Sequence, residues 1–177
     1  MKASVFIATS LDGFIARENG DVDWLTRSDL DQSGEDYGFR KFMESIDTIV
    51  MGRKTFEFVV SSGEWFYGDK TFIVLSSRSI QIPDNFPSTI EILESSPSKL
   101  VQKLSTRGAK HLYIDGGKTI QGFLNAGLIQ QLILTRIPII LGKGIPLFGP
   151  VIRDIKLNLI KTSTFPNGFV QSRYEVL

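Results

Sequence analysis

The chain carries a Gly-Gly pair, Gly116-Gly117, between an apolar β-rich run and a segment with helical spacing. Glycine lacks a Cβ, so the backbone at this pair can adopt conformations closed to other residues and a ligand can approach it closely. The amides of Lys118, Thr119 and Ile120 would then stand at the start of a helix, where unpaired N–H groups and the helix dipole attract anions. The pattern predicts a phosphate site for a nucleotide.

Two further loops of this kind follow apolar runs. In the segment MGRKTFE a glycine and two cations meet at an expected helix start, and in LSSR two serines and an arginine follow a strand, where open α/β sheets bind ligands. Each loop taken alone is also typical of an ordinary turn, but three of them at strand ends favour a nucleotide-binding protein. The residues concerned are Gly52, Arg53, Lys54 and Thr55 in the first loop and Leu75, Ser76, Ser77 and Arg78 in the second.

Short apolar runs rich in β-branched residues alternate with helical patterns through most of the chain. Strands that are apolar at consecutive positions are typical of a parallel sheet covered by helices on both faces. The patterns predict helices near 37–45 and 98–107, the second opened by Ser96-Pro97-Ser98 and closed by Gly108. The predicted strands are 3–8, 48–51, 71–75, 111–114 and 132–140.

The C-terminal part changes to strand patterns without helices between them. Two alternating segments, 155–165 and 169–176, flank Pro166-Asn167-Gly168. Asn-Gly accepts the positive φ angles of tight hairpin turns, so this part predicts an antiparallel hairpin. The expected sheet is therefore mixed, parallel for most strands, while the polar stretch 19–36 is a candidate lid or substrate loop.

Composition excludes several classes of chemistry. The 177 residues fit a single domain, 1–177, and contain no cysteine and one histidine, His111, which excludes thiol catalysis, zinc-thiolate sites and a histidine triad. We expect no metal. The formal net charge of +1 gives no sign of a nucleic-acid-binding face. No signal-type segment or long apolar span is apparent, so we expect a cytoplasmic protein without membrane contact.

Five segments resemble the dihydrofolate reductase superfamily in order and spacing over nearly the whole chain. These segments are IATSLDGFIARENG, IVMGRKTFE, FIVLSSR, LYIDGGKTIQGFLNAG and LILTRIPIILGKGIPLF. The signatures at 10–16 and 140–148 are most similar to the reductase (RibD C-terminal) domain of the bifunctional riboflavin-biosynthesis enzyme and to its small stand-alone bacterial relatives. The resemblance implies a three-layer α/β/α dihydrofolate reductase-like fold.

The resemblance also implies NADPH as cofactor and assigns residues to its parts. Arginines near the adenosine ribose, here Arg53 and Arg78, would favour NADPH over NADH by pairing with the 2′-phosphate. In the family the first strand and its loop meet the nicotinamide, the Gly-Arg helix start binds phosphates, the Leu-Ser-Ser turn flanks the ribose, and the Gly-Gly turn meets the pyrophosphate. The matching positions are Ala8, Ile15 and Ala16; Gly52, Arg53, Lys54 and Thr55; Leu75, Ser76, Ser77 and Arg78; and Gly116, Gly117, Lys118, Thr119 and Ile120.

For catalysis the resemblance points to Asp36, as the acid that dihydrofolate reductases carry on the first helix. Such a group would orient a nitrogen heterocycle and assist its protonation. The alternative is that Asp36 only caps a helix start. Lys70 replaces the arginine that holds the folate tail, so dihydrofolate itself is not the expected substrate.

The sequence thus predicts an NADPH-dependent reductase that transfers hydride to a small pterin- or pyrimidine-like heterocycle. One alternative is the 5-amino-6-(5-phosphoribosylamino)uracil reductase type of activity, with the substrate phosphate received by Lys70, Arg40 or Lys41. Another is a nucleotide-binding protein without reductase activity. The family relatives suggest a homodimer, for which the apolar run 132–147 is a candidate face.

Overall fold

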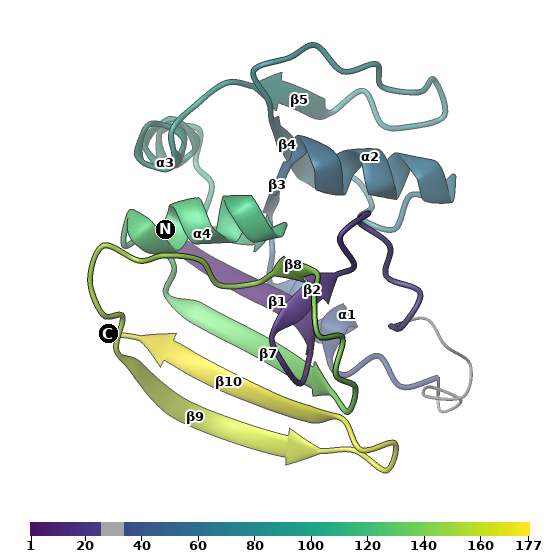
Figure 1. Cartoon of the computed structure of the whole chain (residues 1–177). Coiled ribbons are helices and arrows are strands. Elements are labelled where there is room, and N and C mark those ends of the chain that lie inside the picture. Colours follow the sequence, from purple (N-terminus) through teal and green to yellow (C-terminus); the bar gives the residue numbers. More distant parts are fainter. Residues whose placement is uncertain (26–33) are drawn as a thin grey trace.

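The computed structural model describes residues 1–25 and 34–177. Within them, eight strands form a sheet in the order β5-β4-β3-β6-β1-β7-β10-β9 (Figure 1). The first six of these strands are parallel neighbours, and β10 runs antiparallel to both β7 and β9. The strands are β1 (Lys2–Ser10), β3 (Thr48–Gly52), β4 (Thr71–Leu75), β5 (Ile90–Leu93), β6 (His111–Asp115), β7 (Gln131–Ile137), β9 (Leu157–Thr164) and β10 (Val170–Val176).

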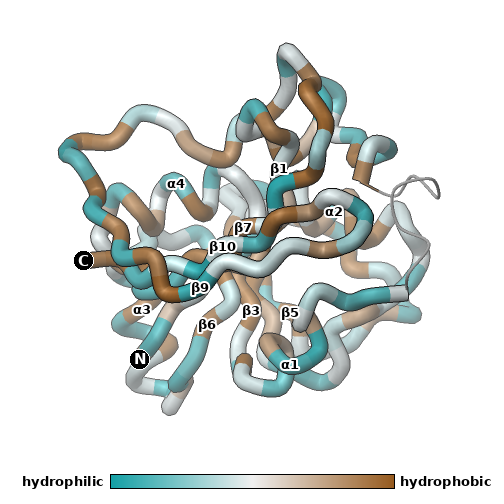
Figure 2. The backbone as a smooth tube through the Cα atoms, turned by 90° about the horizontal axis from the view of Figure 1, so that it is seen from below, coloured by the Kyte–Doolittle hydropathy of each residue, from teal (hydrophilic) through white to brown (hydrophobic). Residues whose placement is uncertain are grey.

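Helices cover both faces of this sheet. The helices are α1 (Phe39–Glu44), α2 (Arg53–Ser62), α3 (Pro97–Thr106) and α4 (Gly117–Asn125). Alternate strand residues point to opposite faces, so Val50 packs with the side chains of α3 and α4, while its neighbour Met51 packs with those of α1 and α2. Figure 2 accordingly shows hydrophobic residues, in brown, along inner strands such as β3 and β7. The predicted three-layer α/β/α fold with a mixed, mostly parallel sheet and a C-terminal hairpin is confirmed.

Three short strands were missed by the sequence patterns. β5 is a parallel edge strand, and β2 (Phe14–Ala16) pairs with β8 (Ile145–Pro146) in a separate two-stranded sheet. Runs of two to four residues are too short to show a period of two. The strand predicted for 132–140 ends earlier, at Ile137, because Pro138 has no N–H to donate to a neighbouring strand.

The hairpin between β9 and β10 has a different turn from the expected one. Gly168 has a φ of 82°, but the only non-glycine residue with positive φ in the described parts of the chain is Tyr37. The amide of Phe165 donates to the carbonyl of Phe169 at 2.9 Å, which closes a three-residue loop. Glycine alone therefore supplies the left-handed residue, as in hairpins that combine a type I turn with a bulge.

The apolar run 132–147 does not supply an exposed face over its strand. Leu132, Ile133 and Ile137 are at most 1% exposed, since β7 lies inside the sheet between β1 and β10. Exposed aliphatic side chains lie on edge strand β9 instead, at Leu159 and Ile160. None of the described helices is long and apolar enough to cross a membrane.

The end of the sheet where the parallel strands begin is fixed by hydrogen bonds around His111. Its Nδ1 lies 3.0 Å from the carbonyl oxygen of Ser45, which can only accept, so Nδ1 carries the proton. Nε2 then accepts from the hydroxyl of buried Ser4 at 2.8 Å. Burial, reinforced by the charge of Lys2, lowers the pKa of His111, although the hydrogen bond to Ser45 and the charge of Asp47 oppose this. The imidazole is therefore held neutral.

A lowered histidine pKa makes stability dependent on pH. Below about pH 6.5 the unfolded chain takes up a proton that the folded chain refuses, so acidification destabilises the fold. We expect the melting temperature of the wild type to fall by about 2–4 °C more than that of His111→Gln between pH 7.5 and pH 5. Thermal denaturation of both proteins across this range provides the measurement, and parallel curves would contradict the role given to His111.

Candidate functional site

The starts of α2 and α4 lie against each other where the parallel strands end. A Cβ built on Gly52 would come within 2.8 Å of the hydroxyl of Thr119. A Cβ on Gly116 would overlap the hydroxyl of Thr55. The two glycines therefore permit a contact that any other residue would prevent, and two of the predicted loops form one site.

Both helix starts lack a capping side chain. Gly116 and Gly52 occupy the positions before α4 and α2, and neither helix has a side-chain cap among the described residues. Gly116 has a φ of 90°, a conformation that L side chains rarely adopt. The first amides of a helix have no acceptor within it, so the two converging starts present unpaired donors and positive dipole ends to an anion.

The loop after β4 joins this site along the sheet. Leu75 is the register partner of Gly52, and the amide of Ser76 donates to the carbonyl of Leu93 at 3.0 Å. Ser76 Oγ accepts from the amide of Arg78 at 3.0 Å, while Ser77 and Arg78 are exposed. The third predicted loop is thus a neighbour of the first.

The cations at the site differ in how they are held. Arg53 Nη1 donates to Glu57 Oε1 at 2.6 Å, so this guanidinium is paired one turn further along its own helix. Lys54 and Lys118 are exposed, one on each helix start. A multiply charged anion at the two helix starts would therefore meet basic side chains from both helices.

The two-stranded sheet of β2 and β8 closes another side of the Gly-Gly turn. A Cβ on Gly117 would lie 2.9 Å from Ile15 Cδ1 and 3.3 Å from the carbonyl oxygen of Pro146. Ala16 is buried beside Ile15. Ala8 belongs to β1 and packs in a different cluster, around the buried Trp24. Two of the three expected nicotinamide contacts are thus in the strand that touches the turn.

Asp36 lies just before α1 and is exposed. Its Oδ1 accepts from the amide of Gly38 at 2.8 Å and its Oδ2 from the amide of Arg40 at 2.9 Å. These bonds, that of Arg40 first, lower the pKa of Asp36. Its described contacts are those of a helix cap that stays ionised, and its catalytic role stays a prediction.

A different carboxyl group, Asp115, stands at the site and was not singled out from the sequence. It is the last residue of β6, next to Gly116, whose amide donates to Asp115 Oδ1 at 2.8 Å. Burial raises the pKa of Asp115 to about 6 against the opposing bonds from Gly116 and Tyr113. The carboxyl group is therefore largely protonated below about pH 6 and largely ionised above it, instead of losing its proton near pH 4. Its signal in the sequence was its place directly before the glycine pair at a strand end.

The side chains proposed to receive a substrate phosphate are not gathered at this site. Lys70 precedes β4, so it lies at the opposite end of the parallel strands, and its Nζ donates to the carbonyl of Ile46 at 2.8 Å. Lys70 is thus held by a backbone carbonyl, and its role toward a substrate stays a prediction. Arg40 and Lys41 are exposed on α1.

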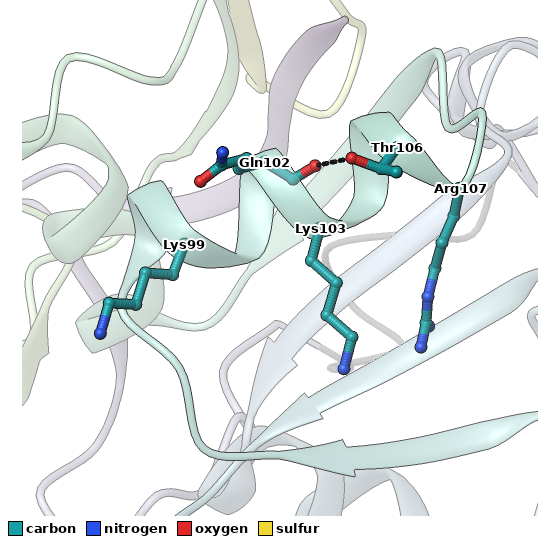
Figure 3. A pocket seen from close by; sticks show the side chains of 5 residues that line it. All are labelled: Lys99, Gln102, Lys103, Thr106 and Arg107. Carbon is teal, nitrogen blue, oxygen red and sulfur yellow. Dashed lines mark hydrogen bonds between the residues drawn. The ribbon is translucent and has the colours of Figure 1, made fainter.

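A second cationic surface occurs outside the site, in a shallow hollow along α3. Figure 3 shows Lys99, Lys103 and Arg107 extending from the same side of this helix. Arg107 Nη1 contacts both carboxylate oxygens of Glu91, at 2.8 and 2.9 Å. This neutralises one of the three charges, and an exposed row of lysines is usual for a solvated helix face.

Known proteins share this architecture. The RibD C-terminal domain family matches residues 2–171. The uncharacterised protein YwjB of Bacillus subtilis (strain 168) is 33% identical over 176 residues, which cover 98% of this chain and 97% of YwjB. A crystal structure from Shewanella sp. PV-4, provisionally named a riboflavin biosynthesis protein, is 37% identical with a TM-score of 0.92 and covers 100% of this chain and 99% of that one.

A longer protein has the same fold at lower identity. Acinetobacter baumannii RibD superposes with a TM-score of 0.75 at 18% identity, covering 99% of this chain and 58% of that one. The fold and the glycine-built strand ends place the protein in the dihydrofolate reductase-like class of α/β proteins. Within that class, the chain belongs to the RibD C-terminal domain family.

The raised pKa of Asp115 predicts an unusual pH dependence of stability. Because its folded pKa exceeds the ordinary value of 3.8, ionisation of Asp115 destabilises the fold as the pH rises through about 6. Asp115→Asn keeps an oxygen for the Gly116 amide and removes the charge. We expect this variant to melt about 2–4 °C above the wild type at pH 7.5 and level with it at pH 4. Calorimetry of both proteins at both pH values measures the melting temperatures. A lower melting temperature of the variant at pH 7.5 would refute the raised pKa of Asp115.

Proposed function

We propose that the protein is an NADPH-dependent reductase that transfers hydride to a small heterocycle of the pyrimidine or pterin type. The observation that carries the proposal is the contact between two uncapped helix starts, built by Gly52 and Gly116. Membership of a family named for a riboflavin-biosynthesis reductase domain supports the reaction class. The proposal treats residues 1–177 as a single reductase domain.

The cofactor fits the residues of the strand-end site. The amides that follow Gly52 and Gly116 would hold its phosphates, with Lys54 and Lys118 beside them. Ile15 and Ala16 would lie against the nicotinamide, and Arg53 and Arg78 would pair with the 2′-phosphate. The bound nicotinamide supplies the hydride, and the chain supplies orientation, charge pairing and a proton.

We assign the role of proton donor to Asp115 and keep Asp36 as the competing candidate. A carboxyl group with a pKa of about 6 is protonated below about pH 6 and in a minor fraction of molecules at pH 7, so it can act as a general acid in mildly acidic solution. Asp36 accepts two backbone amides and has a lowered pKa, so it donates no proton near neutral pH. In that state it could orient a substrate but not protonate it.

The substrate class is favoured by the relatives. One structural neighbour, from Thermotoga maritima, is a diaminohydroxyphosphoribosylaminopyrimidine deaminase/5-amino-6-(5-phosphoribosylamino)uracil reductase, of which this chain covers 56%. We therefore propose the ribosylaminopyrimidine class as the first substrates to test. A nucleotide-binding role without reduction is the alternative that a tight but unreactive NADPH complex would support. The homodimer and the cytoplasmic location stay predictions.

The cofactor assignment is tested by discrimination between NADPH and NADH. Arg53→Ala combined with Arg78→Ala removes two cations that would pair with the 2′-phosphate, so NADPH affinity should fall about tenfold or more while NADH affinity changes little. Fluorescence titration of both cofactors measures this. Lys99→Ala combined with Lys103→Ala, on α3, is the control for a general loss of positive charge. Equal losses for both cofactors in the arginine variant would refute the 2′-phosphate assignment, and absence of NADPH binding by the wild type would overturn the function.

The acid is identified by comparing Asp115→Asn with Asp36→Asn. If Asp115 is the proton donor, its variant should lose about 100-fold or more in kcat without any loss of NADPH affinity. The kcat of the wild type should also fall as the pH rises above about 6, where Asp115 loses its proton. NADPH oxidation with a ribosylaminopyrimidine phosphate and with dihydrofolate is the assay. A large loss in Asp36→Asn together with normal turnover in Asp115→Asn would reverse the assignment.

A further inference from the structure

We propose that Asp12 is a positioning residue for the cofactor, acting through the two-stranded sheet of β2 and β8. This inference rests on the proposed function, because it concerns how the strand that meets the nicotinamide is held. β2 and β8 pair with each other and not with the eight-stranded sheet. Their place over the Gly-Gly turn must therefore be fixed by other contacts.

The Asp12 carboxylate joins the two segments that lead into these strands. Its Oδ1 accepts from the hydroxyl of Ser10 at 2.6 Å and from the amide of Leu141 at 3.1 Å, and its Oδ2 accepts from the amide of Gly142 at 2.8 Å. Ser10 Oγ in turn accepts from the amide of Phe14, the first residue of β2, at 3.0 Å. One exposed carboxylate thus connects the turn before β2 to the segment before β8.

A displacement of the turn before β2 or of the segment before β8 would shift groups that contact the Gly116-Gly117 turn. Gly144 has no room for a side chain, because a Cβ there would overlap the carbonyl oxygen of Ala16. On the other side, Ile15 and Pro146 stand at contact distance from the position of a Cβ on Gly117. Close-packed groups transmit shifts because they have no free volume to absorb them. Loss of the Asp12 bonds would therefore move Ile15 relative to the Gly-Gly turn.

The chain contains a matched control at the other end of the sheet. Asp47 Oδ2 accepts from the amides of Lys110 and His111 at 2.8 and 2.9 Å, and its Oδ1 accepts from the hydroxyl of Thr48 at 2.8 Å. Asp47 is exposed like Asp12 and has the same set of donors, two amides and one hydroxyl. It lies where the parallel strands begin, away from the site. A purely structural contribution should therefore be similar in both residues.

The experiment compares Asp12→Asn and Asp47→Asn with the wild type in three measurements. These are the melting temperature, the NADPH dissociation constant, and hydrogen exchange of peptides covering 11–17 and 139–147. We expect similar decreases in melting temperature for both variants. Only Asp12→Asn should weaken NADPH, by about tenfold, and accelerate exchange in the two peptides. Ser10→Ala removes one of the three donors, so it should weaken NADPH binding and accelerate exchange in the same two peptides to a smaller extent. This variant replaces Asp12→Asn in the comparison if Asp12→Asn fails to fold.

The outcomes separate the two proposals. If the wild type binds NADPH and Asp12→Asn binds it equally well, the positioning role is overturned and the proposed function stands. Equal weakening in Asp12→Asn and Asp47→Asn would also overturn it, because general destabilisation would then account for the loss. If the wild type fails to bind NADPH, the proposed function falls and the role of Asp12 falls with it.

Discussion

The structure depends on a contact that only glycine allows. Where β3 and β6 end, the backbone at Gly52 and Gly116 lies against the hydroxyl groups of Thr119 and Thr55. Any side chain at either glycine would separate α2 from α4, and with them the two sets of helix-start amides. The parallel register of β3 and β6 supports the contact, because it ends both strands at the same edge. The site is thus a consequence of sheet order combined with the missing Cβ.

The two ends of the sheet differ in how their polar groups are paired. Where the parallel strands begin, Asp47 and His111 bond to backbone groups and to buried Ser4, so that end is closed by the chain itself. At the other end, the starts of α2 and α4 lie against each other, and neither has a side-chain cap in the described parts of the chain. Polar groups left without a partner of their own mark the end where a ligand is expected.

Much of the fold was predictable because apolar strands between helices leave a strong pattern. The strands around Val50, Ile73 and Ile114 were predicted from their consecutive apolar residues, since each strand is buried on both faces. β2 and β8 were not, because strands of two or three residues have no readable period and pair only through their tertiary position. The hairpin was predicted correctly, yet its turn uses positive φ at Gly168 alone.

The site was predicted in part for a similar reason. Glycines next to strand ends are visible in the sequence, and the structure brings Gly52, Thr55 and Gly116 together. Asp115 was overlooked because what distinguishes it is the desolvation of its carboxyl group by the surrounding fold, which a sequence does not display. The contact of Lys70 Nζ with the carbonyl of Ile46 was not predicted, because it joins two segments that are distant in the sequence.

The raised pKa of Asp115 has a consequence for any anion that binds at the two helix starts. Such an anion would lie beside a carboxyl group that is largely ionised at pH 7, and its negative charge would raise that pKa further. Binding would then draw protons from solution, and the affinity would increase as the pH falls toward 6. A carboxyl group next to a phosphate cradle thus couples occupancy of the site to proton uptake, so the enthalpy measured for binding would depend on the ionisation enthalpy of the buffer.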